Sequence, residues 1–491
     1  MNTLTSENTL HRSGAELNFG ELLARHPDLQ LHQDEYNINV TANNGASISG
    51  AEVLQRYIHH DGAGQPAHLY FHVPLCSYIC HFCNYVKQLL PRGNKQDEIL
   101  DEWTSMLIDE SQRYLDRVPW LSKARIESFY IGGGTAALLR ERQLGRLLDH
   151  VTRNYDFSSD CELTLEGNPD NFSREQIRAA QKLGFNRFSV GVQSFQDEVN
   201  RFTRRGHDSN TSLRAIRNLL ESKSPFNVDV MFGLPFQTAD SVEQDLQTLV
   251  ELRAPTITIY RLRNADRHKM GIGNQAVWNI PKVKERLHSE GRFPALQQTY
   301  QMRERAVRVL FDHDYYPSPC GWWNAPGTYP DGNIPRVSRN KWQYLHTMVA
   351  FGPGSYGWLT GESPDVVQTH NEADIAAYVR HMKTSDEPPI SFGRHLEGLQ
   401  AVAFALGFAF KANQPIKIKR FQQQFGINLL DDSPSREVLI ELIDKNLLSL
   451  SDDGLTMRPT LDGEALHEEI ITVYLHGRIG SFAAPLCRKA C

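Results

Sequence analysis

The 491-residue sequence has no uninterrupted apolar run approaching eighteen residues, and its first residues, MNTLTSENTLHRSGAEL, lack the apolar core of a signal peptide. It also has no large excess of charge, since a net charge of −6 with 22% charged residues is ordinary for a globular protein. These absences argue against a membrane or a nucleic acid as a partner and predict a cytoplasmic protein. The length predicts two or three domains and a large core.

Cysteine is scarce, yet three of the seven lie in LCSYICHFCNY (75–85), namely Cys76, Cys80 and Cys83. In a reducing compartment such a cluster indicates metal or redox chemistry rather than disulfides. Three thiolates are one ligand short of a closed site. This leaves a structural zinc completed by His81 or His72, or a [4Fe-4S] cluster with one open iron. The other cysteines are predicted to be core residues (Cys161, Cys320) or frayed terminal thiols (Cys487, Cys491).

Between residues 66 and 262, short apolar, β-rich runs alternate with amphipathic helical stretches. The runs are AHLYFHV (67–73), IESFYI (126–131), CELTLE (161–166), NRFSVGV (186–192), NVDVMFG (227–233) and TITIYRL (256–262). Helical patterns cover 97–115, 140–155 and 240–252, and an earlier one at 49–59 opens with a possible cap, Ser49. This alternation predicts βα units around a parallel sheet, with the chemistry at the carboxyl ends of the strands.

The predicted domains are an N-terminal arm (1–65), a core that carries the sites (66–300) and a C-terminal domain (301–491). In the last, a segment rich in Trp, Gly, Pro and Asn (317–358) is interpreted as a substrate wall, followed by a helical, winged-helix-like module. Its aromatic residues either form a flat pocket for a conjugated substrate or pack this domain onto the core. They are Trp322, Trp323, Trp342 and Tyr344.

The spacing C-x3-C-x2-C, with an aromatic residue before the last cysteine, resembles the signature loop of the radical S-adenosylmethionine (radical SAM) superfamily. Six further motifs resemble that superfamily's oxygen-independent coproporphyrinogen III oxidase branch, in its order and spacing: YFHVPLC (70–76), FYIGGGTAALL (129–139), LEGNP (165–169), GFNRFSVGVQSF (184–195), RGH (205–207) and NVDVMFGLP (227–235). The resemblance covers residues 66–262 well. It implies an α/β fold, a parallel βα partial (TIM-like) barrel with a mainly helical C-terminal domain.

The resemblance also implies cofactors and their ligands. Cys76, Cys80 and Cys83 would hold a [4Fe-4S] cluster, and an electron from it would cleave SAM to a 5′-deoxyadenosyl radical. Tyr70, Gly133 and Glu166 would contact this SAM, whereas Phe82, Gly134, Thr135, Gln193, Arg205 and Asp229 correspond to a second SAM site. His72 would relay a proton or contact substrate, with a packed, hydrogen-bonded histidine as the alternative. A flavodoxin or ferredoxin is the expected electron donor.

The sequence departs from the porphyrin oxidase at several places. Residues 31–49 do not match its substrate-closing arm, Ala136 replaces a proline, Asn84 replaces a small residue, and residues 260–269 are polar. These differences favour a different substrate, and the leading hypothesis is radical methyl or methylene transfer to a small organic molecule, such as an aromatic natural product. The rival hypotheses are tetrapyrrole chemistry, either oxidative decarboxylation or anaerobic haem opening, and a haem-binding chaperone without turnover.

Overall fold

A computed structural model describes residues 18–29, 45–262, 277–318, 321–328, 334–361, 365–411, 415–431 and 433–481. Its centre is a thirteen-stranded sheet. In spatial order the strands are β1 (Ala46–Ser49), β15 (Ile390–Glu397), β14 (Asp365–Asn371), β13 (Tyr356–Thr360), β12 (Met348–Phe351), β2 (Pro66–Val73), β5 (Arg125–Gly133), β6 (Asp156–Gly167), β7 (Arg187–Gln193), β8 (Phe226–Phe232), β9 (Thr256–Arg261), β11 (Trp322–Asn324) and β10 (Tyr316–Ser318). The order is linear, so the described strands form a partial barrel.

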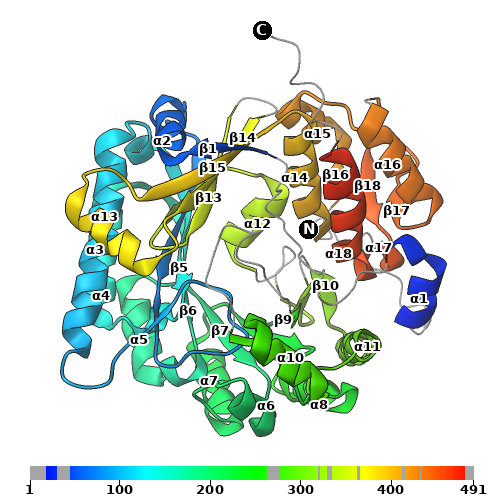
Figure 1. The fold of residues 1–491 in the computed structure, drawn as a ribbon, viewed down its shortest axis with the longest axis horizontal. Coiled ribbons are helices and arrows are strands. Elements are labelled where there is room, and N and C mark those ends of the chain that lie inside the picture. Colours follow the sequence, from blue (N-terminus) through cyan, green and yellow to red (C-terminus); the bar gives the residue numbers. More distant parts are fainter. Residues whose placement is uncertain are drawn as a thin grey trace.

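The six predicted runs are confirmed as β2 and β5 to β9, and each is parallel to its neighbour in the sheet. Helices connect them and lie along the outer side of the curved sheet (Figure 1). They are α3 (Gln96–Arg117), α4 (Glu141–Asn154), α5 (Arg174–Leu183), α6 (Asp197–Phe202), α7 (Ser209–Ser222) and α8 (Ala239–Glu251), with α10 (Pro281–Ser289) and α11 (Leu296–Asp312) after β9. The predicted βα architecture is therefore correct.

The alternation of side chains along β2 separates an apolar face from a polar one. Leu69, Phe71 and Val73 are fully buried in the core shared with the outer helices. Because successive strand residues point to opposite faces, His68 and Tyr70 take the inner face. The same alternation along the other parallel strands gives the barrel a polar interior, and its functional side chains lie there.

Local sequence signals place the shorter elements. The predicted cap Ser49 begins α2 (Gly50–His59), where its hydroxyl accepts from the Glu52 backbone N–H and the Glu52 carboxylate accepts from the Ser49 N–H. The cysteine loop, residues 75–89, begins with β3 (Leu75–Cys76) and ends with β4 (Gln88–Leu89), and these two strands pair. Short 3-10 helices cover Pro27–Leu29, Leu121–Lys123, Ala136–Leu138, Pro169–Asn171 and Val277–Asn279.

The C-terminal half continues the sheet before turning helical. Strand β12 lies parallel to β2, and β13, β14, β15 and β1 follow it antiparallel. The helices that remain are α1 (Phe19–Arg25), α12 (Arg336–Gln343), α13 (Ile375–Thr384), α14 (Leu399–Lys411), α15 (Ile418–Phe425), α16 (Ser433–Asp444), α17 (Leu461–Ala465), α18 (His467–Ile470) and a π-helix (Ile471–Ile479). A small sheet of β16 (Ile416–Lys417), β18 (Thr456–Pro459) and β17 (Leu448–Leu450) contains the predicted closing hairpin.

Helices α14 to α18 gather beside the barrel, near α1 (Figure 1). Their apolar faces form a second core with α12 and with residues of β12, β13 and β14. No described helix is long and apolar enough to cross a membrane. Because strands from both predicted larger domains share one sheet, the proposed boundary near residue 300 falls within a continuous structure.

Candidate functional site

The cysteine loop leaves the carboxyl end of β2 and is fixed at its base. Pairing of β3 with β4 joins its two ends, and the Leu90 N–H donates to the Cys76 carbonyl at 2.8 Å. All three thiols are free of disulfides; those of Cys76 and Cys80 are buried, and that of Cys83 is partly so. The loop is thus a closed turn that presents three thiols at the end of the barrel where the chemistry was predicted.

The surroundings of the thiols fit a bound metal cluster. Burial raises the pKa of Cys76 to about 12 and also raises the pKa of Cys83, so their thiolates need a cation for compensation. A Cβ on Gly134 would lie 2.9 Å from the Cys76 sulfur, so only glycine leaves room there. The Arg205 guanidinium donates to the Cys80 sulfur at 3.4 Å. These features suit a [4Fe-4S] cluster with three thiolate ligands and one open iron.

His72 is held from both ring nitrogens. Its Nε2 donates to the Val86 carbonyl at 2.8 Å, and its Nδ1 accepts from the Tyr70 hydroxyl at 3.3 Å. Burial lowers the pKa of His72 to about 4, which keeps the imidazole neutral. The packed, hydrogen-bonded alternative therefore describes its resting geometry, in which it ties the far end of the cysteine loop to β2. A role in proton relay stays a prediction.

Gly133 ends β5 directly beside this histidine. Its φ of 110° lies in the region that favours glycine, and a Cβ there would lie 2.7 Å from the His72 Nδ1. The glycine run predicted for close backbone approach is therefore required by the protein's own packing. Whether it also approaches SAM stays a prediction.

Two partly buried carboxyl groups, those of Glu166 and Asp229, lie on the inner face near the strand ends. Glu166 accepts from the Tyr130 hydroxyl at 2.9 Å and from the Gly133 backbone, and burial, with Asp229 nearby, raises the pKa of Glu166 to about 7. Burial raises the pKa of Asp229 to about 6, although Asn227 donates to it at 2.8 Å. A cationic ligand would favour the ionised form of both groups. An ammonium or sulfonium is therefore the ligand chemistry that this pair suits.

Arg205 connects the cysteine loop to two strand ends. Its guanidinium donates to the Gly191 carbonyl and, at 3.0 Å, to the Asn168 side-chain oxygen, and its Nε donates to His207 at 3.2 Å. It also lies 5.7 Å from the centre of the Tyr78 ring. These contacts fix the partly buried cation beside Cys80, where it can pair with a carboxylate.

The remaining residues predicted to bind the second SAM differ in how they relate to Arg205. Thr135 accepts from Asn168 at 3.0 Å and so joins the same network. Gln193 ends β7 with a φ of 73°, an unusual conformation for a residue with a side chain. Phe82 instead joins an apolar cluster and packs against Trp278, with ring centres 6.3 Å apart. The structure thus joins Thr135 to Arg205 through Asn168, whereas Asp229 lies near Glu166 and Phe82 faces an apolar wall.

Sequence reasoning did not single out Asn168, Tyr130 or Tyr78. Asn168 bridges Thr135 and Arg205, and Tyr130 holds Glu166. Asn168 lies two positions after the predicted strand 161–166, and a polar residue just beyond a strand end is the signal that could have identified it. Tyr78 lies inside the cysteine loop, but its contact with an arginine 127 positions later leaves no local signal.

The tryptophans of the predicted wall do not share one pocket. Trp322 and Trp323 are adjacent on β11 and so face opposite sides of the sheet. Trp323 packs edge-on against Phe311 of α11 in the outer core, with ring centres 5.2 Å apart. Tyr344 is partly exposed beneath Arg420. For these three, packing is the arrangement that the structure shows, and the side chain of Trp342 lies outside the described residues.

Of the four cysteines outside the loop, the structure describes one. Cys161 is buried in the outer core, as predicted. Cys320, Cys487 and Cys491 lie outside the described residues.

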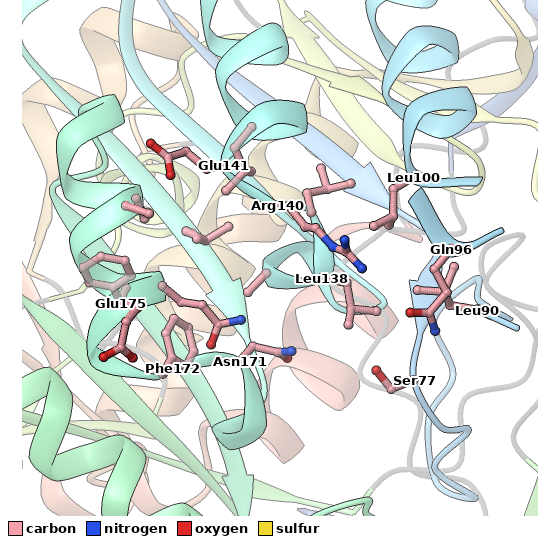
Figure 2. Close-up of a pocket in the computed structure, with 18 residues that line it drawn as sticks. Ser77, Leu90, Gln96, Leu100, Leu138, Arg140, Glu141, Asn171, Phe172 and Glu175 are labelled. Carbon is pink, nitrogen blue, oxygen red and sulfur yellow. The ribbon is translucent and has the colours of Figure 1, made fainter. Parts of the chain in front are cut away.

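A cavity of about 520 Å³ opens beside the cysteine loop, between α3, α4 and α5. Figure 2 shows Ser77 on one side of it, Leu138 and Arg140 in the middle and Glu175 on the other side. None of the residues predicted to bind the cluster or SAM lines it. This cavity therefore lies among the outer helices and is distinct from the predicted cofactor site.

Comparisons with known proteins agree with this geometry. Residues 70–249 match the radical SAM superfamily. The heme chaperone HemW of Bacillus subtilis (strain 168) is 26% identical over 410 residues, which cover 83% of this chain and 98% of that protein. Anaerobilin synthase of Escherichia coli O157:H7 is 30% identical over 241 residues, 48% of this chain and 52% of that protein.

One solved structure shows the same fold. Coproporphyrinogen III oxidase (HemN) from Escherichia coli, described as a radical SAM enzyme, matches with a TM-score of 0.70 at 19% identity over 87% of this chain and 94% of that one. The cysteine loop at the end of β2 and the parallel strands around it fall within the matched superfamily region. Residues 70–249 are therefore a radical SAM domain, and the chain fits the branch of that superfamily to which HemN belongs.

Proposed function

We propose that this protein is a radical SAM enzyme that acts on a tetrapyrrole. The observation that carries the proposal is the joint presence, at one end of the barrel, of a three-thiol loop, a fixed arginine and two partly buried carboxyl groups. The similar proteins are named for haem, anaerobilin or coproporphyrinogen, and this supports a tetrapyrrole as the substrate class.

In this proposal the chain's residues bind and orient the reactants. Cys76, Cys80 and Cys83 hold the cluster, which when bound supplies the electron for SAM cleavage. Glu166 and Asp229 attract the positive charges of SAM, and Arg205 pairs with a carboxylate. The set exceeds what a single SAM requires, which supports two bound SAM molecules.

Methyl or methylene transfer, the leading hypothesis from the sequence, receives no support from the comparisons. The tetrapyrrole alternatives agree better with them. A haem-binding chaperone is the second candidate function, favoured by the near-complete alignment of the Bacillus protein. We favour turnover over haem carriage because the carboxyl pair and Arg205 supply charges that the binding of a cluster alone does not require.

Product analysis under anaerobic conditions tests the proposal. Reconstituted protein would be mixed with dithionite, methyl-labelled SAM, and either haem or coproporphyrinogen III. We expect 5′-deoxyadenosine together with a changed tetrapyrrole, and Cys80→Ala should abolish both, whereas Cys161→Ala, which removes a core thiol, should keep them. Stable haem uptake without SAM cleavage would establish the chaperone instead. Transfer of the methyl label from SAM to a product would instead support the methyl-transfer hypothesis.

A further inference from the structure

Three potential metal ligands meet on the barrel at the end opposite the cysteine loop. They are His68 of β2, Glu127 of β5 and His346 of the segment before β12, and their ligand atoms all lie within 4.8 Å of one another. Neighbouring strands bring them together, since His68 pairs in register with Ser128 on one side and with Met348 on the other. His68 precedes His72 by four residues, which is about 13 Å along a strand, so the group is separate from the cluster site.

The imidazole of His68 is oriented as that of a metal ligand usually is. His68 is 2% exposed, and its Nδ1 is hydrogen-bonded to the Ser128 hydroxyl at 2.7 Å. Its Nε2 is buried and has no hydrogen-bond partner within the described chain, and the same holds for Nδ1 of His346. A hydrogen bond from one ring nitrogen, which orients the other, is the usual support for a metal-bound histidine.

Charge at the site is compatible with a cation. Burial lowers the pKa of His68 to about 3 and that of His346 to about 4, so both rings are neutral and keep a lone pair. Glu127 uses Oε1 to bind Arg125 at 2.8 Å, while Oε2 faces the His346 Nδ1 at 4.0 Å. Its second oxygen is thus directed toward the unpartnered nitrogen.

Two further arginines face the histidines, and each has another partner. Arg336 pairs with Asp160 at 2.8 Å, and Arg420 lies over the Tyr344 ring at 4.4 Å. The positive charge near the site is therefore partly compensated by groups outside it.

We propose that His68, Glu127 and His346 bind a divalent transition-metal ion of the zinc class. Two imidazoles and one carboxylate at about 2.0 to 2.2 Å from the ion are an ordinary zinc ligand set, with water in the fourth position. Ligand atoms in such a site lie about 3.4 Å apart, so the three side chains must close by small rotations. The ion would join β2, β5 and the segment that leads into β12, which makes it a structural link between the barrel core and the C-terminal half.

Zinc binding by the cluster-loaded protein tests this. After chelator treatment, anaerobic dialysis against zinc should leave one zinc per chain with iron content unchanged, and zinc should raise the melting temperature. His346→Ala and Glu127→Ala should each weaken zinc binding at least tenfold and remove the thermal shift. His59→Ala, which removes an exposed histidine of α2, should do neither.

Ser128→Ala provides a test that keeps all three ligands. Loss of the hydrogen bond to His68 should weaken zinc binding by about ten- to a hundredfold. If the wild-type protein retained no zinc after dialysis, the proposal would be overturned. Equal affinity in the wild type, His346→Ala and Glu127→Ala would also overturn it, because the bound zinc would then lie elsewhere.

Discussion

Replacement of Gly133 by alanine tests the link between β5, His72 and the cysteine loop. The new Cβ would lie 2.7 Å from Nδ1 and 2.9 Å from Cε1 of His72, closer than real Cβ contacts. Relief requires the imidazole to move, and this breaks its hydrogen bonds to Tyr70 and to the Val86 carbonyl. The end of the cysteine loop would then lose its tie to β2.

The cost follows from the separate contributions. A left-handed backbone with a side chain costs about 1 to 2 kcal/mol. Loss of two hydrogen bonds adds about 1 to 3 kcal/mol. We therefore expect Gly133→Ala to lower the free energy of unfolding by about 2 to 5 kcal/mol, as measured by anaerobic urea denaturation, and to lower the iron and sulfide retained per chain.

Gly145→Ala is the matched control. Gly145 lies within α4, where a Cβ would meet only Leu183 at an ordinary 3.5 Å. Alanine there improves helix propensity by about 1 kcal/mol, so stability should be kept or raised. If Gly133→Ala matched this control in stability and iron content, the proposed packing of Gly133 against His72 would be refuted.

Three further substitutions test the polar site and the core. Arg205→Lys keeps the charge but loses the fork that reaches Asn168 and the loop, so SAM affinity measured by calorimetry should fall about tenfold or more. Because burial, with Asp229 nearby, raises the pKa of Glu166 to about 7, the carboxyl gains its charge as pH rises, and cationic SAM should bind more tightly at about pH 8 than at about pH 6. Glu166→Gln should weaken binding and flatten this dependence. The buried Glu110 of α3 accepts from the Gly352 N–H, the Tyr378 hydroxyl and the Asn371 amide. Glu110→Ala leaves the first two without an acceptor and should lower the free energy of unfolding by about 2 to 6 kcal/mol, as measured by urea denaturation.

Each substitution has an exposed counterpart of the same type. Arg174→Lys, Glu175→Gln and Glu102→Ala remove exposed groups on α5 and α3 and should leave SAM binding and stability nearly unchanged. Equal effects of Arg205→Lys and Arg174→Lys on SAM affinity would contradict the conclusion that Arg205 connects the cysteine loop to the strand ends. If SAM binding by the Glu166→Gln protein kept the same pH dependence, a group other than Glu166 would be responsible for it. A stable Glu110→Ala protein would show that water replaces the lost acceptor.

The sequence was sufficient to predict the parallel core. Strand and helix periodicities located all six strands, and the capping pattern at Ser49 located α2. The rule that parallel strands carry chemistry at their carboxyl ends placed Glu166, Arg205 and the cysteine loop at the same end of the barrel.

Contacts between residues far apart in the sequence could not be predicted. Arg205 reaches Cys80 across 125 positions, and no periodicity reports such a contact. The pairing of β12 with β2, which brings His346 to His68, is equally invisible in local patterns. The opposite directions of Trp322 and Trp323 follow from strand alternation, but segment 317–358 had no predicted strand on which to apply that rule.

The position of β12 beside β2 has a consequence for synthesis of the chain. Met348 pairs with His68, so one edge of β2 stays uncovered until about 280 further residues have been translated. An open strand edge favours pairing with other chains, and long-range pairings form slowly. The cysteine loop leaves this same strand. We therefore expect the nascent chain to need protection against aggregation, and cluster insertion to follow completion of the sheet rather than accompany translation of the loop.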